Sequence, residues 1–362
     1  MNVPSVDLNG AKMVPTIHKT GPWNLSDLKD IEKNGYKVFS CFHCGGGSTM
    51  GYKLSGFDVL GGVEIDPQMM AIYKANHNPK HSFLMGVQDF NKIPREDLPA
   101  ELFDLDILDG SPPCSSFSSA GSREKAWGKN KKFREGQAVQ VLDDLFFHFI
   151  ETARILQPKV VIAENVKGLI TGKAKGYVKE ISQMFNHAGY DLQLFLLNAA
   201  FMGVPQKRER TFFVARKKSI GLDKIKLDFK EEPIRFSQIK TNSCQTTDLS
   251  KRELILWENR KINDLHIGFI NKRMTGKISG FTTMLQHDSK CLYTITASDS
   301  NILYSEPRHL NRREYMHGQT FPDDFNFLKA KTKYITGMSV PPYMMNRISK
   351  QVELQWLDKL NG

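Results

Sequence analysis

The chain has 362 residues, of which 40% are hydrophobic, so it can bury a sizeable core as one large domain with a smaller partner or as two domains. The sequence has no apolar run long enough to span a membrane and no signal-like N-terminus, and its five cysteines are an odd number. These features exclude a membrane-embedded or disulfide-built protein and favour the reducing cytoplasm. The net charge of +11 lies mainly in residues 121–135 (+4) and 216–300 (+6), which favours a polyanionic partner such as nucleic acid.

The first informative stretch is a glycine loop that follows a predicted strand. Residues 1–36 form a weakly patterned N-terminal extension to which we assign no function, and residues 37–42 read as a buried strand. Gly45, Gly46 and Gly47 come next, before a helix, where glycine lets the backbone approach a ligand closely. A second strand over residues 57–66 carries Glu64 near its end, where a carboxylate suits ribose hydroxyls. The pattern predicts a nucleoside-containing cofactor, and dinucleotides and S-adenosylmethionine both fit.

The same loop contains a C-x-x-C pair formed by Cys41 and Cys44. Redox chemistry or zinc binding would be possible uses, but Cys244 and Cys291 supply no second ligand pair, and a redox motif should open a helix. We expect the two cysteines to pack beneath the loop, and we expect no metal.

A possible nucleophile follows the fourth predicted strand. The third strand, residues 81–90, ends near Asp89, which could accept a hydrogen bond from an adenine amino group or could be an ordinary turn residue. The fourth, residues 103–108, leads through a Gly-Ser-Pro-Pro turn to Cys114. A strand that ends in a rigid turn displays a nucleophile well, although a free cysteine is often only a small buried hydrophobe. Residues 115–137 are polar and basic, and we expect them to be an active-site lid.

Further polar residues are predicted at the same edge of the sheet. After a helix over residues 138–156, a fifth strand over 158–163 ends in Glu164 and Asn165, facing the crevice of Glu64 and Cys114. After a helix over 176–188, strands over 190–197 and 210–216 follow, and strand alternation predicts that Arg208 and Arg210 share one face. The alternative for this arginine pair is a charged edge strand.

The alternation of strands and helices stops after Arg216. Residues 37–216 are therefore the predicted catalytic and cofactor-binding domain, and residues 217–326 a second, recognition domain. Residues 327–362, with a last helix over 343–359, are expected to return to the catalytic domain.

These motifs, in this order, resemble the DNA (cytosine-5) methyltransferase family. The resemblance covers the chain outside residues 1–35 and 217–305, the latter being where the family keeps its variable target-recognition region. The matching segments are Phe42 with Gly46–Gly51, Glu64–Asp66, Asp89–Phe90, Pro113–Cys114, Glu164–Val166, Gln206–Arg210, Arg313–Glu314, Gln319–Pro322 and Gly337–Pro342. Two positions depart from the family pattern: Cys44 replaces its first glycine, and Met338 replaces an asparagine.

The resemblance implies an α/β fold, a Rossmann-like methyltransferase sheet with a smaller, irregular recognition domain. It implies transfer of a methyl group from S-adenosylmethionine to C5 of a flipped-out cytosine in a specific duplex DNA sequence, through an adduct between Cys114 and C6. Glu164 would hold the N3 edge of the base, Asn165 would orient the loop, and Arg208 with Arg210 would bind O2 and a phosphate. The expected cofactor-binding residues are Phe42, Gly45, Gly46, Gly47, Ser48, Glu64, Ile65, Asp89, Phe90, Pro113, Ser339 and Val340.

The expected partner is double-stranded DNA, and no membrane. Candidate DNA-binding residues are Ser118, Arg123, Lys125, Lys129, Lys131, Lys132, Arg252 and Arg273, with Lys251, Arg260 and Lys272 as further candidates. We expect a monomer in the cytoplasm, associated with the nucleoid through DNA and paired functionally with a restriction endonuclease. The alternatives are a tRNA cytosine-5 methyltransferase of the same fold, a nicotinamide-dependent dehydrogenase, which would leave Cys114 and Glu164 without a shared task, and an inactive DNA-binding relative.

Overall fold

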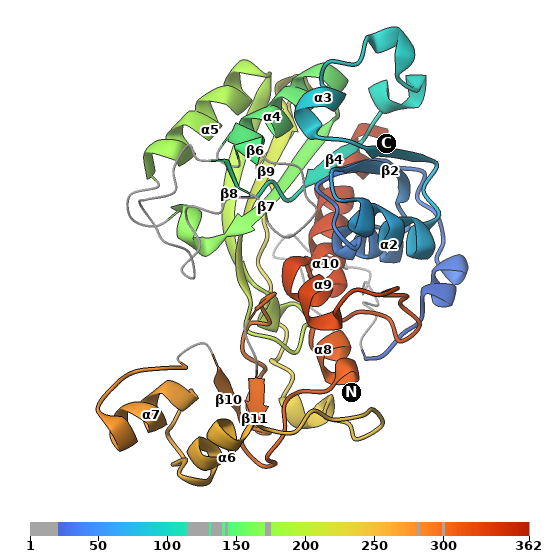
Figure 1. Cartoon of the computed structure of the whole chain (residues 1–362). Helices are drawn as coiled ribbons and strands as arrows, with labels where there is room; N and C mark the ends of the chain where they lie inside the picture. The colour runs from blue at the N-terminus through green and yellow to red at the C-terminus, as the bar shows by residue number, and fades with distance from the viewer. Residues whose placement is uncertain are drawn as a thin grey trace, which may run out of the picture.

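The computed structural model describes residues 21–113, 130–131, 140–141, 144–170, 175–280, 283–298 and 301–361. Its centre is a seven-stranded sheet in the order β3-β2-β1-β4-β7-β9-β8 (Figure 1). The first five of these strands run parallel, and β9 is antiparallel to both of its neighbours, β7 and β8. The strands are β1 (Lys37–Cys41), β2 (Asp58–Glu64), β3 (His81–Leu84), β4 (Ile107–Gly110), β7 (Val160–Val166), β8 (Tyr190–Asn198) and β9 (Glu209–Lys217).

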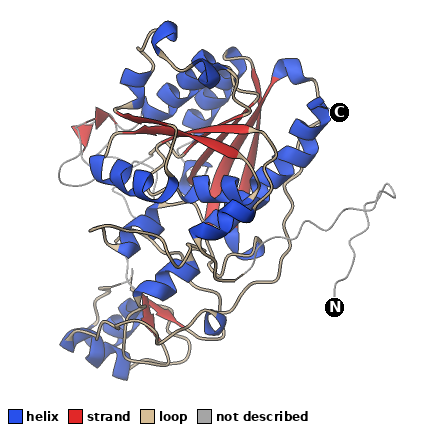
Figure 2. Ribbon diagram, turned by 90° about the vertical axis from the view of Figure 1, so that its right-hand side faces the viewer, coloured by secondary structure: helices blue, strands red, loops and turns tan. Residues whose placement is uncertain are grey.

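Helices cover both faces of this sheet (Figure 2). The central strands are almost wholly buried, as expected for parallel strands that are covered on both sides. One face packs against α1 (Gly47–Leu54), α2 (Pro67–His77) and α10 (Pro342–Val352). The other packs against α3 (Val87–Phe90), α4 (Leu145–Leu156) and α5 (Lys175–His187). Two hydrophobic cores, one on each face, therefore hold the sheet in place.

The order of the strands creates a crevice between β1 and β4. From β1 the chain proceeds outward through β2 to β3, and from β4 it proceeds the other way to β7. In such a sheet the loops at the carboxyl ends of the two central strands separate, and ligands bind there. The loop after Cys41 and the turn after Gly110 both start at this point, because these two residues are partners in the β1–β4 register.

A smaller part of the molecule lies apart from the sheet (Figure 1). It contains α6 (Lys251–Glu258), α7 (Ile267–Thr275) and the parallel pair β10 (Met284–Gln286) and β11 (Asn301–Leu303), with α8 (Arg312–Gly318) and α9 (Thr332–Met338) leading back to the large domain. Its small cores contain Leu256 and Ile270 in one and Phe236 and Leu310 in the other.

The packing narrows the predicted boundaries of the recognition domain. Ile225 and Leu227 at its start, and Phe321 and Phe325 at its end, belong to the core of the large domain. The separately packed part is therefore shorter than the predicted 217–326.

The two ends of the described chain are joined. Trp23 is buried, its indole Nε1 donates to the Thr320 carbonyl at 2.9 Å, and the Tyr343 hydroxyl donates to the Gly21 carbonyl. At the C-terminus, α10 continues through a π-helical turn (Glu353–Leu357) into α11 (Asp358–Asn361), so the predicted last helix is present. Short 3-10 helices lie at Leu25–Asp30, Arg95–Asp97, Ala100–Phe103, Lys167–Ile170, Ala199–Phe201, Lys218–Ile220 and Phe236–Gln238.

The sequence placed most of the strands well, with two exceptions. The strand predicted over residues 103–108 begins later, because Ala100–Phe103 form a 3-10 helix and β4 covers Ile107–Gly110. The strand predicted over residues 81–90 ends at Leu84, and Val87–Phe90 form the single-turn helix α3 instead. Of the lid predicted over residues 115–137, only the two-residue strand β5 (Asn130–Lys131) is described, and it pairs with β6 (Gln140–Val141). The rest of the predicted lid lies outside the described residues. No helix among the described residues is long and apolar enough to cross a membrane.

Candidate active site

The glycine loop at the end of β1 is enclosed by protein on several sides. A Cβ atom at Gly45 would lie 2.6 Å from the Ile335 side chain, and one at Gly46, where φ is +84°, would overlap Nε2 of the His77 ring. A Cβ at Gly47 would overlap the Val340 carbonyl oxygen. The prediction attributed these glycines to close approach of a ligand. In the structure all three are required by the approach of other parts of the chain.

Buried polar side chains hold the backbone of this loop. The Glu64 carboxylate accepts from the Cys44 amide at 3.0 Å, the His43 Nδ1 lies 3.1 Å from the Cys44 carbonyl, and the His77 Nε2 lies 3.2 Å from the Gly45 carbonyl. Burial raises the pKa of Glu64, lowers the pKa of His43 to about 4 and lowers that of His77 well below its usual value. Both histidines are therefore neutral donors at pH 7. Phe42 and Cys44 have φ of +56° and +48°, the region that favours glycine, which is the residue type that the family usually has at position 44.

The ends of β2 and β3 present acceptors that fit a nucleoside. Glu64 accepts from the amides of Cys44, Ile65 and Asp66, and its carboxylate keeps capacity to accept from a hydroxyl group. The Oε1 of Gln88 is buried and has no hydrogen-bond partner among the described residues, so this amide, which the sequence reasoning missed, is available to an amino group. Ile65 and Phe42 are half-buried beside this site.

Four other predicted cofactor residues have roles within the protein. Asp89 is exposed on α3 and pairs with Lys92 at 2.9 Å, while Phe90 is buried in the core, stacked 5.7 Å from the Phe39 ring. Ser339 and Val340 are buried and lie against Gly47, the position at which α1 begins. This packing supports the loop from behind, and for Phe90 it argues against direct contact with a ligand.

The turn after β4 is tied to the end of β7. Asn165 is 4% exposed, its Nδ2 donates to the Pro112 carbonyl at 3.0 Å, and its Oδ1 accepts from the Val166 amide. The described part of the turn ends at Pro113, so Cys114, the next residue, lies outside the described residues.

Glu164 and Arg210 form a nearly buried ion pair beside this turn. Arg210 Nε lies 2.9 Å from Glu164 Oε1, and the two side chains are only 14% and 11% exposed. They come from neighbouring antiparallel strands, because Glu164 pairs with Phe212 and Val166 pairs with Arg210 in the β7–β9 register. The ion pair places a carboxylate and a guanidinium at the carboxyl end of β7, close to the Pro112 turn.

Arg208 has a different environment from Arg210. It precedes β9, is 2% exposed, and donates through Nη1 to the Ile295 carbonyl and through Nη2 to the Gly337 carbonyl. The predicted contact with cytosine O2 does not suit this geometry, since both terminal nitrogens join the recognition part to the C-terminal segment. Strand alternation could not show this, because both partners are distant in the sequence.

Sequence reasoning also overlooked Asp109, the residue before Gly110 at the end of β4. It is 3% exposed and accepts from the Ser40 hydroxyl at 3.1 Å and the Tyr52 hydroxyl at 3.2 Å. Burial, reinforced by the charge of Glu164, raises its pKa to about 7. A carboxylate directly after a buried strand, five residues before Cys114, was the signal that could have identified it.

Most of the predicted DNA-binding side chains belong to residues that the structure does not describe. Ser118, Arg123, Lys125, Lys129 and Lys132 lie outside the described residues, and of Lys131 only the backbone strand is described.

The two predicted DNA-binding arginines of the recognition part are engaged within the protein. Arg273 forms a bidentate pair with Asp264, at 3.0 and 2.9 Å, and Arg252 donates to the Ser279 hydroxyl at 3.0 Å. Lys251 and Lys272 are exposed on the same two helices, so they suit phosphate contact better than these arginines do.

The cysteines of the C-x-x-C pair lie in packing environments. Cys41 is buried among apolar residues, and the Cys44 sulfur lies 3.5 Å from that of Met69. The described residues contain no cluster of His, Cys, Asp and Glu that could hold a metal ion. Both sulfurs pack against other parts of the chain beside the glycine loop.

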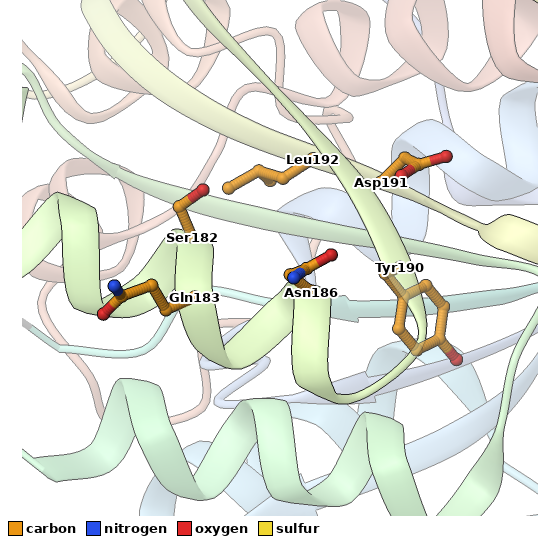
Figure 3. Close-up of a pocket in the computed structure, with 6 residues that line it drawn as sticks. All are labelled: Ser182, Gln183, Asn186, Tyr190, Asp191 and Leu192. Atoms are coloured by element: carbon orange, nitrogen blue, oxygen red, sulfur yellow. The ribbon is translucent and has the colours of Figure 1, made fainter.

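A polar surface pocket of about 300 Å³ lies away from this site (Figure 3). It is lined by residues of α5 and the start of β8, including Asn186, Tyr190 and Asp191. Tyr190, the first residue of β8, pairs with Lys217 of β9. The neighbouring Arg216 of β9 pairs with Val160, the first residue of β7. The pocket is therefore at the amino edge of the sheet, opposite Glu164 and Asp109.

Comparison with known proteins identifies the family. The family model described as C-5 cytosine-specific DNA methylase matches residues 36–354. This chain is a member of that family. It is 32% identical to the Type II methyltransferase M.NgoPII of Neisseria gonorrhoeae over 62% of this chain and 57% of that protein. It is 28% identical to the Type II methyltransferase M.FnuDI of Fusobacterium nucleatum over 89% of this chain and 96% of that protein.

A solved structure supports the same fold. The S. pombe Dnmt2 methyltransferase aligns with 91% of this chain and all of its own, with a TM-score of 0.58 and 16% identity. The methylase is thus a DNA (cytosine-5) methyltransferase with a mostly parallel, Rossmann-like sheet, and its cofactor is S-adenosylmethionine. The dehydrogenase alternative is thereby excluded, and DNA is the substrate that the family implies.

Proposed function

We propose that the protein methylates C5 of a cytosine flipped out of duplex DNA, with Cys114 as the covalent nucleophile. The observation that carries this proposal is the arrangement at the carboxyl ends of β4 and β7. Asn165 on β7 holds the Pro112 carbonyl, two residues before Cys114, and the neighbouring Glu164 pairs with Arg210 of β9. A thiol, a carboxylate and a guanidinium on adjoining segments supply the groups that this reaction needs.

The chemistry follows from these groups. The Cys114 thiol gives up its proton as the sulfur adds to C6, and N3, whose edge Glu164 holds, takes up a proton. The electron pair of the C5–C6 double bond then makes C5 nucleophilic. S-adenosylmethionine, when bound, supplies the methyl group that C5 attacks. A base, which we take to be water, then removes the C5 proton, and the Cys114 sulfur leaves as the double bond re-forms. Arg210 keeps the Glu164 carboxylate in place and balances charge in this nearly buried setting.

The cofactor would be held at the crevice between β1 and β4. Glu64 would bind the ribose hydroxyls, Gln88 would accept from the adenine amino group, and Phe42, Ile65 and Pro113 would border the site. The glycine loop and Ser48 would approach the methionine portion from the start of α1.

The recognition part and the basic segment 121–135 would bind the duplex. A base within the stack is out of reach, so the target must be flipped out, and cations on both sides of the site would hold the phosphates. We further propose a monomer that acts on nucleoid DNA in the cytoplasm and is paired with a restriction endonuclease. The relatives named Type II methyltransferases support that pairing.

The test is methyl transfer from labelled S-adenosylmethionine to duplex DNA of mixed sequence, with tRNA as the competing substrate. We expect labelled duplex DNA with the wild type, and none with Cys114→Ser, which should still bind the cofactor. Labelling of tRNA alone would favour the alternative substrate. Undiminished turnover by Cys114→Ser would refute the covalent mechanism.

A further inference from the structure

Asp109 is a buried carboxyl group that lacks a positive partner among the described residues. Its hydrogen-bond donors are the neutral hydroxyls of Ser40 on β1 and of Tyr52 and Ser48 on α1. Glu164, on the same face of the sheet, has Arg210 as its counter-ion. Buried carboxylates are normally paired with a cation or kept protonated, so the surroundings of Asp109 are those of a group that awaits a positive charge.

The position of Asp109 indicates where that charge would come from. The residue is the last but one of β4, directly opposite Ser40 of β1, at the crevice between the two central strands. The glycine loop begins on one side of this point and the Pro112–Pro113 turn on the other. A ligand that spans the crevice therefore places its central atoms near this carboxyl group.

We infer that Asp109 makes the site selective for the cationic methyl donor over its neutral product. S-adenosylmethionine carries a sulfonium charge that S-adenosylhomocysteine lacks, and the ionised Asp109 stabilises only the former. The inference rests on the proposed function, since it assumes the cofactor at this crevice. Asp109 acts through charge in the crevice, so release of the spent cofactor becomes easier once the methyl group has left.

The groups around Asp109 make this selectivity depend on pH. The titratable groups that interact with Asp109 are Cys41 on β1, Tyr52 on α1, Tyr73 on α2 and Glu164 on β7. None of these four groups is a cation. With a pKa of about 7, Asp109 ionises across the neutral range. Affinity for the cationic donor should therefore rise as pH increases through 7, and affinity for the neutral product should not.

The experiment measures binding, not turnover. Dissociation constants of S-adenosylmethionine and S-adenosylhomocysteine are determined by calorimetry from pH 6 to 8.5, without DNA. For the wild type, we expect the preference for the donor to grow roughly tenfold over this range, as one charge at several ångströms would give. Asp109→Asn should bind both ligands with a constant ratio.

Two further variants separate charge from structure. Tyr52→Phe removes a donor that lowers the pKa of Asp109, so the rise in donor affinity should move to higher pH. Asp106→Asn is the matched control: Asp106 is a buried carboxylate just before β4, and it already pairs with Lys159 at 2.7 Å. This control should keep the wild-type ratio and pH profile.

The outcomes are distinct. An unchanged ratio and pH profile in Asp109→Asn would overturn the inference, and so would an unshifted profile in Tyr52→Phe should Asp109→Asn fail to fold. If the wild type bound neither ligand, the proposed function itself would fail.

Discussion

Replacing Gly47 by alanine tests the packing of the glycine loop against the C-terminal segment. The added Cβ would overlap the Val340 carbonyl oxygen and lie 2.8 Å from the Ser339 Cβ. Overpacking typically costs about 1–3 kcal/mol, and the upper end applies because a backbone oxygen cannot rotate away. Alanine within a helix gains roughly 0.5–1 kcal/mol over glycine. The net expectation for Gly47→Ala is a loss of about 2 kcal/mol in the free energy of unfolding.

Gly176→Ala is the matched control, because Gly176 lies in α5 with nothing within 4 Å of its Cβ position. Gly176→Ala should gain only the stabilisation of alanine over glycine in a helix, so the free energies of unfolding of the two variants should differ by about 3 kcal/mol in urea. The affinity of Gly47→Ala for S-adenosylmethionine should also fall, since the start of α1 must move. Equal stabilisation of both variants would refute the packing argument.

Three other changes follow from the same structure. Arg210→Met leaves the Glu164 carboxylate nearly buried without its counter-ion and should cost about 3–5 kcal/mol in urea unfolding, most of it regained when Glu164→Gln is added. Trp23→Ala should cost roughly 3–5 kcal/mol because the indole is 2% exposed, and proteolysis at residues 21–34 should accelerate. Burial lowers the pKa of His43 to about 4, so as pH falls below 6.5 this histidine is protonated in the unfolded chain before it is protonated in the folded protein. The free energy of unfolding should therefore drop by roughly 3 kcal/mol by pH 4. His43→Phe should flatten that pH dependence in urea titrations, and a slope equal to that of the wild type would contradict the role of His43.

The strands themselves and the edge of the sheet that carries the polar residues could be predicted because the signals are local. Buried strands read as apolar runs, and Glu64, Asn165 and Glu164 follow or end their strands at the same edge of the sheet. That placement depends only on where each strand stops and on the parallel direction of the sheet.

The roles of individual side chains depended on distant contacts. Strand alternation placed Arg208 and Arg210 on one face, and the family resemblance gave them the base and a phosphate as partners. In the structure, Arg208 donates instead to the carbonyls of Ile295 and Gly337, roughly 90 and 130 positions further along the chain. Likewise, Gly46 was predicted to contact a ligand, but in the structure the His77 ring lies against it. No local pattern contains such information.

Asp89 shows a different limit of the sequence reasoning. Its segment has the apolar residues of a strand, but the chain turns at Gly86 and forms a helical turn that exposes the carboxylate. The amide of Gln88, next to it in the chain, is instead a buried acceptor that has no partner in the part of the chain that the structure describes. A one-turn helix after a short strand leaves too few residues for a periodic signal.

Bisulfite sequencing of DNA from cells that express the protein tests the central claim most directly, because it reports the base, its position on the ring and the sequence context together. The wild type should protect one cytosine within a single sequence context from conversion, and Cys114→Ser should protect none. Complete conversion of every cytosine in cells that contain folded wild-type protein would contradict cytosine-5 methylation of DNA. Protection that persists with Cys114→Ser would contradict the assignment of the nucleophile.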